Sequence, residues 1–282
     1  MLEVLNKIYV GPAGIPLTSK KQSTPEGVKR VAELGLDAME IEFVRGVRMS
    51  AEVASETRYV SRELGVVLTV HAPYYVNLLS EDPAKVEASI KRVLDSARVG
   101  YLAGAWSVAF HPGYYGKLNS EKAVEVVRKH LINIVKELIN EGIKIWVRPE
   151  TMGGLAEVGS LEEVISIVEG VELSLPVVDF AHIYARSLGK VNSYEEYVRI
   201  LSLIEERLGR EALNNMHIHM SGIEYGVRGE KKHLNLKESR FNWVEVLKAL
   251  KDFKIAGVII CESPSLEYDA LIIKEKINAL ST

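Results

Sequence analysis

Histidine and carboxylate side chains stand at the ends of several apolar segments of this chain. In the segment 176–186, PVVDFAHIYAR, the apolar run ends at Asp179, and His182 follows three residues later. The other such residues are His71, His111, Glu150, His217, His219 and Glu262. Imidazole nitrogens beside carboxylate oxygens form a ligand set suited to Zn²⁺, and also to Mn²⁺ or Fe²⁺. The pattern therefore indicates metal chemistry, provided that the fold brings these segment ends together.

No single one of these residues establishes a site. A histidine after a strand is more often a packed core or loop residue than a ligand, and a lone glutamate is often a helix cap or a solvated acid. Of the 7 histidines, however, only His130 lies in a helical pattern, where we expect a solvated face. Carboxylates gathered at one end of an apolar fold would repel one another unless protons or cations intervened. We therefore expect a site with several cations, in which a carboxylate bridges ions about 3.5–4 Å apart.

Short β-branched runs alternate along the chain with longer segments whose apolar residues recur at helical spacing. We expect a helix after each strand, several of them capped by Ser, Thr or Asp and ended by Gly, with the last helix starting near Leu266. The expected strands are 7–11, 38–43, 66–71, 106–111, 144–150, 172–179, 214–220 and 256–262.

This alternation predicts an α/β fold, a single-domain (β/α)₈ TIM barrel over residues 1–282. An open doubly wound sheet is the alternative, but no G-x-G-x-x-G follows the first strand. No linker or low-complexity tract divides the chain. The longest non-periodic stretch, 221–241, is expected to be a functional loop after the seventh strand. In a barrel the carboxyl ends of all strands meet on one face, so the chemical residues would share one rim.

Composition restricts the setting. The net charge of −3 gives no global sign of a nucleic-acid partner, so such binding would need a local basic surface. We expect no membrane association, because the first ten residues carry an early acid and no later stretch is apolar enough for a span. The single Cys261 fits a reducing cytoplasm, and the single Gln22 among many charged residues favours a heat-adapted source. We expect a monomer.

Six short motifs, in this order, resemble those of endonuclease IV, the zinc-dependent apurinic/apyrimidinic endonuclease family. They are VHAPYYVNL (70–78), FHPG (110–113), PETMGG (149–154), VDFAHIYA (178–185), MHIH (216–219) and CESP (261–264). Each motif alone would be weak evidence. The full set is specific, and the resemblance runs from about residue 8 to the C-terminus.

The resemblance implies a cluster of three zinc ions. His71 and His111 would hold a first ion, which Glu150 would bridge to a second. The second site would be completed by Asp179, His217 and Glu262. His182 and His233 would bind a third ion. Asp179 and His182, which follow the same strand, would then bind two neighbouring ions.

The third site departs from the family pattern. The family has an acid two positions before the loop histidine, whereas here Lys231 stands two positions before His233. Lysine cannot replace that acid as a ligand at neutral pH. Glu230, three residues before His233, would replace it after a loop adjustment, or His219 would enter the site. Two firm cations are therefore expected, and the third stays open.

The resemblance also implies an activity on double-stranded DNA that contains abasic sites. Water activated by the cations would cut the phosphodiester 5′ to the abasic nucleotide, leaving a 3′-hydroxyl and a 5′-deoxyribose phosphate, with Glu150 as the catalytic carboxylate. Tyr74 would press into the helix at the lesion, and Arg48, with Arg45 nearby, would enter the stack. Lys231 and Lys232 would contact phosphates. Rim packing for Tyr74 and solvated charge for the basic residues are the alternatives.

Two other functions remain open. A sugar isomerase or epimerase on the same barrel would need only Glu150, Asp179, His217 and Glu262 as ligands. It would not need His71, His111 and His182. A barrel without catalytic activity that only binds DNA or a protein is the other possibility, and a metal-free protein would favour it.

Overall fold

A closed barrel of parallel strands forms the centre of the molecule. The computed structural model describes residues 4–281, so residues 1–3, including the early acid Glu3, and residue 282 lie outside the description. The strands form two four-stranded parallel sheets, ordered β1-β10-β7-β6 and β2-β3-β4-β5. They are β1 (Ile8–Pro12), β2 (Ala38–Glu42), β3 (Val67–His71), β4 (Ser107–Phe110), β5 (Trp146–Pro149), β6 (Val177–Asp179), β7 (Met216–Met220) and β10 (Gly257–Cys261).

Backbone contacts join the two sheets on both sides. Between β1 and β2, the amide of Gly14 donates to the carbonyl of Glu40 at 2.9 Å. Between β5 and β6, Thr151 donates to the carbonyl of Val177 at 3.0 Å. Gly11 permits the first closure, since a Cβ on it would meet the Ala38 carbonyl oxygen at 1.5 Å. The predicted TIM barrel is thus confirmed, and the open sheet is excluded.

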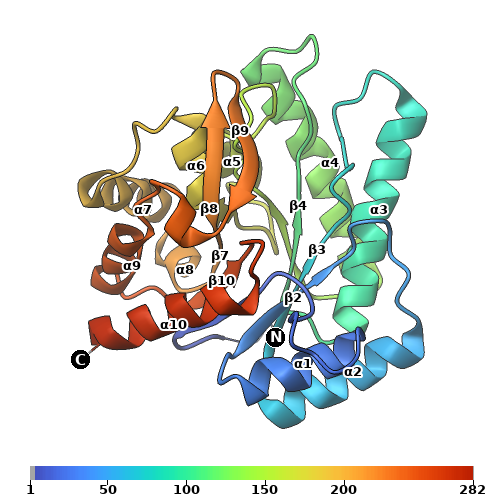
Figure 1. Cartoon of the computed structure of the whole chain (residues 1–282). Coiled ribbons are helices and arrows are strands. Elements are labelled where there is room, and N and C mark those ends of the chain that lie inside the picture. The colour runs from blue at the N-terminus through green and yellow to red at the C-terminus, as the bar shows by residue number, and fades with distance from the viewer. Residues whose placement is uncertain (1–3, 282) are drawn as a thin grey trace.

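Helices cover the outside of the barrel (Figure 1). The longer ones are α1 (Thr24–Glu33), α2 (Ala51–Leu64), α3 (Pro83–Leu102), α4 (Ser120–Asn140), α5 (Leu161–Val168), α7 (Tyr194–Leu208), α9 (Trp243–Asp252) and α10 (Glu267–Ser281). Their ends follow the expected chemistry. At α2, for example, the Ser50 side chain accepts from the Val53 amide, and the helix ends at Gly65 with φ of 67°. Within residues 4–281, no helix combines the length and the apolar character that a bilayer crossing requires.

The connections hold more structure than the sequence predicted. The stretch 221–241, expected to be a loop, contains the antiparallel hairpin β8 (Gly222–Gly226) and β9 (Gly229–Leu234), followed by the 3₁₀ turn η1 (Leu236–Glu238). Short helices α6 (Phe180–Arg186) and α8 (Arg210–Leu213) were also not predicted. The orange hairpin stands beside α6 in Figure 1. The hairpin and α6 lie at the mouth of the barrel, where they carry candidate ligands.

Candidate metal centre

Strand ends bring most of the predicted ligands into one buried cluster. Glu150, Asp179 and His219 are fully buried, and His71 and His182 are only 1% and 3% exposed. All but His182 lie at the carboxyl end of a strand or directly after it, and His182 is on the first turn of the helix that follows β6. Parallel strands in a barrel all present these ends to the same face, which is why distant segments meet.

The first group of ligand atoms surrounds one oxygen of Glu150. Its Oε2 lies 3.1 Å from His71 Nε2 and 3.4 Å from His111 Nε2. The His71 Nδ1–H donates to the carbonyl of Ala72 at 2.7 Å. Once it has lost its second proton, an imidazole held in this way keeps its lone pair on Nε2, facing the cluster.

The second group surrounds the other oxygen of Glu150. His219 Nδ1 lies 3.0 Å from Glu150 Oε1 and 3.4 Å from Glu262 Oε1. Ligand atoms of Glu150, Asp179, His219 and Glu262 all lie within 4.8 Å of one another. These four side chains can therefore share one cation.

The structure corrects one member of this second group. The sequence prediction placed His217 with Asp179 and Glu262, but His219 occupies that position. Both histidines face the barrel interior, since they are two residues apart on β7, and about 6.5 Å of strand separates them. His219 is the one nearer the carboxyl end. His217 lies deeper, with its Nε2 3.1 Å from Glu40 Oε2 and its Nδ1 3.0 Å from Ser107 Oγ.

The third group joins α6 to the hairpin. His182 is on the first turn of α6, where the Asp179 side chain caps the helix by accepting from the His182 amide at 2.7 Å. Its Nδ1–H donates to the Thr151 carbonyl at 2.9 Å, which leaves Nε2 as the free nitrogen. That nitrogen lies 3.2 Å from His233 Nε2 and 3.2 Å from Glu230 Oε2. His233 Nε2 is also 3.4 Å from Glu230 Oε1.

A bulge in the hairpin explains how Glu230 reaches this group. Tyr225 pairs with Glu230 and Glu224 pairs with Lys232, so Lys231 is an extra residue in β9. Side chains alternate along a regular strand, and residues three apart would face opposite sides. The extra residue puts Glu230 and His233 on the face toward the barrel. Lys231 and Lys232 contact Glu224 at 3.2 Å and 3.5 Å, and Lys231 also lines the cavity that lies over the candidate ligands.

Glycines let the hairpin approach the loop after β5. Glu230 donates from its amide to the Gly153 carbonyl at 3.0 Å, and Leu155 donates to the Arg228 carbonyl at 3.0 Å. A Cβ at Gly153 would lie 2.6 Å from Glu230 Oε2. The backbone contact between Glu230 and Gly153 therefore sets how close the Glu230 side chain lies to His182.

The charges in the cluster are strongly perturbed. Burial raises the pKa of Asp179 to about 6 and that of Glu42 to about 8. Burial opposes protonation of His71, but the hydrogen bond to Glu150 and the charge of Glu42 raise its pKa to about 10. Without cations, protons on these side chains thus offset the repulsion among the carboxylates. Divalent cations can replace those protons, because the donors are the same atoms.

Unsatisfied atoms support the fit of cations. Among the described residues, Asp179 Oδ2 and Glu262 Oε2 are buried and accept no hydrogen bond. Leaving such oxygens without a partner is costly, and a cation satisfies them. The imidazole and carboxylate donors of all three groups suit Zn²⁺, Mn²⁺ or Fe²⁺.

Two acids near the centre were missed by the sequence reasoning. Glu40 and Glu42 both lie on β2, where Glu40 is fully buried and Glu42 is half-buried. Glu42 Oε2 accepts from the Tyr74 hydroxyl at 2.9 Å. The sequence did offer a signal for them: in the expected strand AMEIE, the two acids stand at alternate positions among apolar residues. Buried strands of a parallel barrel are otherwise apolar, so such acids indicate a polar interior.

The predicted DNA-binding residues lie around the mouth. Tyr74 is 43% exposed, and its ring centroid lies 4.8 Å from that of His71. Arg45 and Arg48 are exposed and line a cavity of about 810 Å³ beside Glu42. A cavity of about 460 Å³ lies over the candidate ligands, with Tyr74 on its wall. Tyr74, Arg45 and Arg48 are thus all exposed at cavities on the side of the barrel that carries the candidate ligands.

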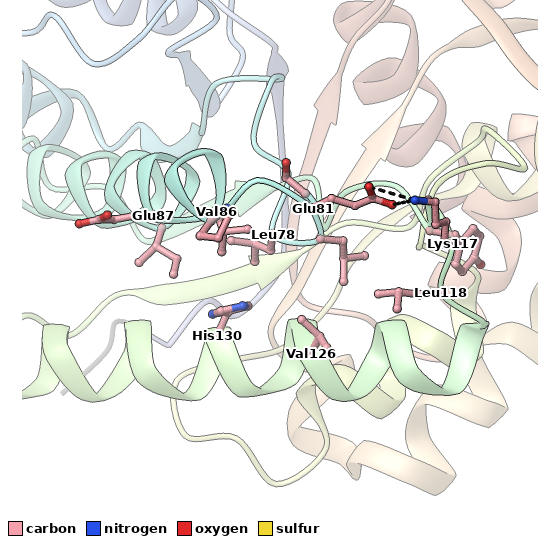
Figure 2. Close-up of a pocket in the computed structure, with 14 residues that line it drawn as sticks. Leu78, Glu81, Val86, Glu87, Lys117, Leu118, Val126 and His130 are labelled. Carbon is pink, nitrogen blue, oxygen red and sulfur yellow. Dashed lines mark hydrogen bonds and ion pairs between the residues drawn. The ribbon is translucent and has the colours of Figure 1, made fainter.

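A separate cavity of about 500 Å³ lies between α3 and α4 (Figure 2). His130 lines it and is half-buried, so this histidine is only partly exposed to solvent. None of the candidate ligands lines this cavity.

Comparisons with known proteins agree with the fold. The family model described as xylose isomerase-like TIM barrel matches residues 28–282. An uncharacterized protein of Methanocaldococcus jannaschii is 41% identical over 273 residues, which cover 97% of this chain and 98% of that protein. The probable endonuclease 4 of Mycoplasma pneumoniae is 27% identical over 204 residues, 70% of this chain and 68% of that protein.

Two kinds of solved structure share the fold. A D-tagatose 3-epimerase-like protein superposes with a TM-score of 0.71 and 22% identity, covering 92% of this chain and 95% of that one. Endonuclease IV from Thermus thermophilus superposes with a TM-score of 0.68 and 21% identity, covering 96% and 98%. At this identity the likeness shows the fold alone, so the choice between nuclease and epimerase depends on the site.

Proposed function

The chain belongs to the xylose isomerase-like TIM barrel family, and from this premise we propose that it is a cation-dependent phosphodiester hydrolase of DNA repair. The proposed substrate is double-stranded DNA with an abasic nucleotide, cut on its 5′ side to leave a 3′-hydroxyl and a 5′-deoxyribose phosphate. We place this reaction in the cytoplasm, on a monomer. Relatives named endonuclease 4 support the proposal.

One observation carries the proposal: two further ligand groups flank the four-residue group of Glu150, Asp179, His219 and Glu262. His71 and His111 form one, and His182 with His233 forms the other. A cluster of cations suits phosphodiester hydrolysis, since charge develops on several oxygens at once. We propose Zn²⁺ at the two groups that share Glu150, and a third cation at His182, His233 and Glu230.

Glu150 is the proposed catalytic carboxylate. Its two oxygens face different imidazoles, with Oε2 3.1 Å from His71 Nε2 and Oε1 3.0 Å from His219 Nδ1. It can therefore serve two ligand groups together and orient the attacking water between them. Cations at this centre would lower the pKa of that water and offset charge on the phosphoryl oxygens.

Residues at the rim would select the substrate. A missing base reduces the cost of moving a nucleotide out of the stack and into the mouth. Tyr74 presents its ring there, while Arg45 and Arg48 offer guanidinium groups for the backbone. Lys231 and Lys232 contact Glu224, which offsets part of their charge, and Lys231 lines the cavity over the candidate ligands. We propose these four basic residues as the local basic surface that a chain of net charge −3 would need to bind DNA.

A sugar isomerase or epimerase is the second candidate. The group Glu150, Asp179, His219 and Glu262 favours it, because these four ligands suffice for one cation. Glu42, whose pKa is raised to about 8 by burial of its carboxyl group, would offer such an enzyme a protonated acid.

The test is incision of a duplex with one abasic analogue, with and without a chelator, beside a ketose epimerisation assay. We expect cutting 5′ to the lesion that the chelator abolishes and Zn²⁺ restores. His111→Ala should reduce cutting by about 10²-fold or more. His130→Ala is the matched control, since it removes a half-buried histidine that is outside the candidate centre.

The other outcomes decide against the nuclease. Epimerisation without incision would select the second candidate. Binding of DNA without either reaction, by a protein that takes up no metal, would indicate a barrel that only binds.

A further inference from the structure

A polar layer lies in the barrel directly below the candidate metal centre. Its members are Glu40, Thr69, Ser107, Arg148 and His217, all 0% exposed. Barrel interiors are usually filled by bulky apolar side chains. Burying such groups is costly unless they are paired, so their presence calls for a physical reason.

Glu40 is the centre of this layer. Its Oε2 accepts from the Thr69 hydroxyl at 2.8 Å and lies 3.1 Å from His217 Nε2. Its Oε1 lies 3.1 Å from His219 Nε2. His217 is itself held from below, since its Nδ1 is 3.0 Å from Ser107 Oγ. Glu40 is thus hydrogen-bonded by Thr69 on one oxygen, which also lies at ion-pair distance from His217. Its other oxygen lies at ion-pair distance from His219, and neither that oxygen nor His219 Nε2 has a hydrogen-bond partner among the described residues.

His219 lies between two carboxylates. Its Nδ1 faces Glu150 in the candidate centre at 3.0 Å, and its Nε2 faces Glu40 below at 3.1 Å. A histidine binds a metal through one nitrogen, and a carboxylate at the other nitrogen commonly sets the ring orientation and tautomer. The ring nitrogen of His219 that lies near Glu150 and Glu262 is Nδ1, so Nε2 is left for Glu40.

We propose that Glu40 is a positioning residue, which holds Nε2 of His219 so that Nδ1 is presented to a divalent cation shared with Glu150, Asp179 and Glu262. This inference rests on the cation site of the proposed function but not on the reaction catalysed there. The carboxylate also makes His219 a stronger donor, because negative charge at one nitrogen raises the basicity of the other.

Glu42 provides a matched comparison. It is two residues along the same strand and therefore on the same face, but its carboxylate accepts from Tyr74. No ion pair joins it to His219 within residues 4–281. Glu40→Gln and Glu42→Gln therefore change the same kind of group on the same strand, and only the first removes the contact with His219.

The experiment measures cation affinity and geometry in the full chain. The wild type, Glu40→Gln and Glu42→Gln are stripped, titrated with Zn²⁺ against a competing chelator, and then loaded with Co²⁺ for visible absorption spectra. For Glu40→Gln we expect one Zn²⁺ to bind about 10- to 100-fold more weakly, with a changed Co²⁺ band. For Glu42→Gln we expect a change of less than about threefold and an unaltered band.

Glu40→Asp separates contact from charge. Its carboxylate is one methylene shorter, so it keeps the charge in the layer but withdraws from His219. We expect its Zn²⁺ affinity to fall between those of the wild type and Glu40→Gln. Full affinity in Glu40→Asp would overturn a role that depends on contact. Melting of the stripped proteins checks that all variants fold.

Remaining outcomes are also decisive. If Glu40→Gln melts earlier but keeps the wild-type affinity and Co²⁺ spectrum, Glu40 is only structural and the proposal is wrong. A wild type that binds no Zn²⁺ overturns it as well. If the wild type binds Zn²⁺ yet cuts no abasic DNA, the proposed function fails while this inference stands on the metal measurements.

Discussion

The candidate centre has two halves that are built differently. His71, Glu150 and Asp179 stand at strand ends inside the closed barrel, where they are at most 1% exposed. Glu230 and His233 come from the hairpin β8–β9, and their side chains are 23% and 25% exposed. The first half is held by the barrel itself. The second is held by packing of the hairpin against α6 and by its contact with the loop after β5, and a bulge sets which side chains face inward.

This difference indicates how each half responds to change. Strand ends are fixed by hydrogen bonds to neighbouring strands on both sides, so removing one ligand leaves the others in place. The hairpin strands form a separate two-stranded sheet outside the barrel, so we expect a backbone shift there to move Glu230 and His233 together. We therefore expect the barrel half to govern the reaction and the hairpin half to tune it.

The largest effect is expected in the barrel half. Glu150→Gln keeps the size of the side chain but removes the charge that both ligand groups share, so incision should fall on the order of 10³-fold or more. Single-turnover incision and metal content by elemental analysis are the measurements. Cutting near the wild-type rate would remove Glu150 from the proposed bridge.

The hairpin half should give a smaller and more local effect. Glu230→Gln removes the carboxylate that lies beside His182 and His233 on the inner face of the hairpin. We expect one cation to bind about 10- to 100-fold more weakly. The two cations around Glu150 should remain. Glu224→Gln is the control, since Glu224 is on the outer face of the same hairpin. Equal losses in both variants would contradict a specific site.

Gly153→Ala tests the contact between the halves. The added Cβ would meet Glu230 Cβ at 2.7 Å and His182 Cδ2 at 3.2 Å, so the hairpin must move away. We expect the third cation to bind about tenfold more weakly, and a stability cost of about 1–3 kcal/mol from overpacking. Gly226→Ala is the matched control, because its Cβ would meet only the flexible end of Lys231. Unchanged metal titrations in Gly153→Ala would show that this contact does not set the site.

The same two halves differ in how far the sequence predicted them. The barrel and most of its strand-end residues followed from apolar periodicity, since a closed parallel barrel places all carboxyl ends together. Depth within the barrel was harder to predict. His217 and His219 lie on the same face of β7, and only their depth along the barrel decides which one reaches Glu150. The spacing in the sequence does not give that depth, so the prediction assigned the wrong histidine.

The hairpin half depended on features that periodicity does not encode. Glu230 reaches His182 only because Lys231 is an extra residue, and a bulge depends on the pairing strand as much as on its own sequence. Glu40 was missed for another reason. Its chemistry comes from contact with His217 and His219, which are far away in the chain and meet it only inside the barrel.

Deletion of Lys231 should have the smallest effect. Without it, Glu230 and His233 become two residues apart, and in a regular strand such residues face the same side. The third group should therefore survive, with metal content unchanged and incision within about threefold, the loss of one positive charge being the main change. His233→Ala is the opposing variant, since it removes a ligand of the third group and should release the third cation. If deletion of Lys231 also released the third cation, the bulge itself would be needed to position Glu230, and the two-residue spacing would not be enough.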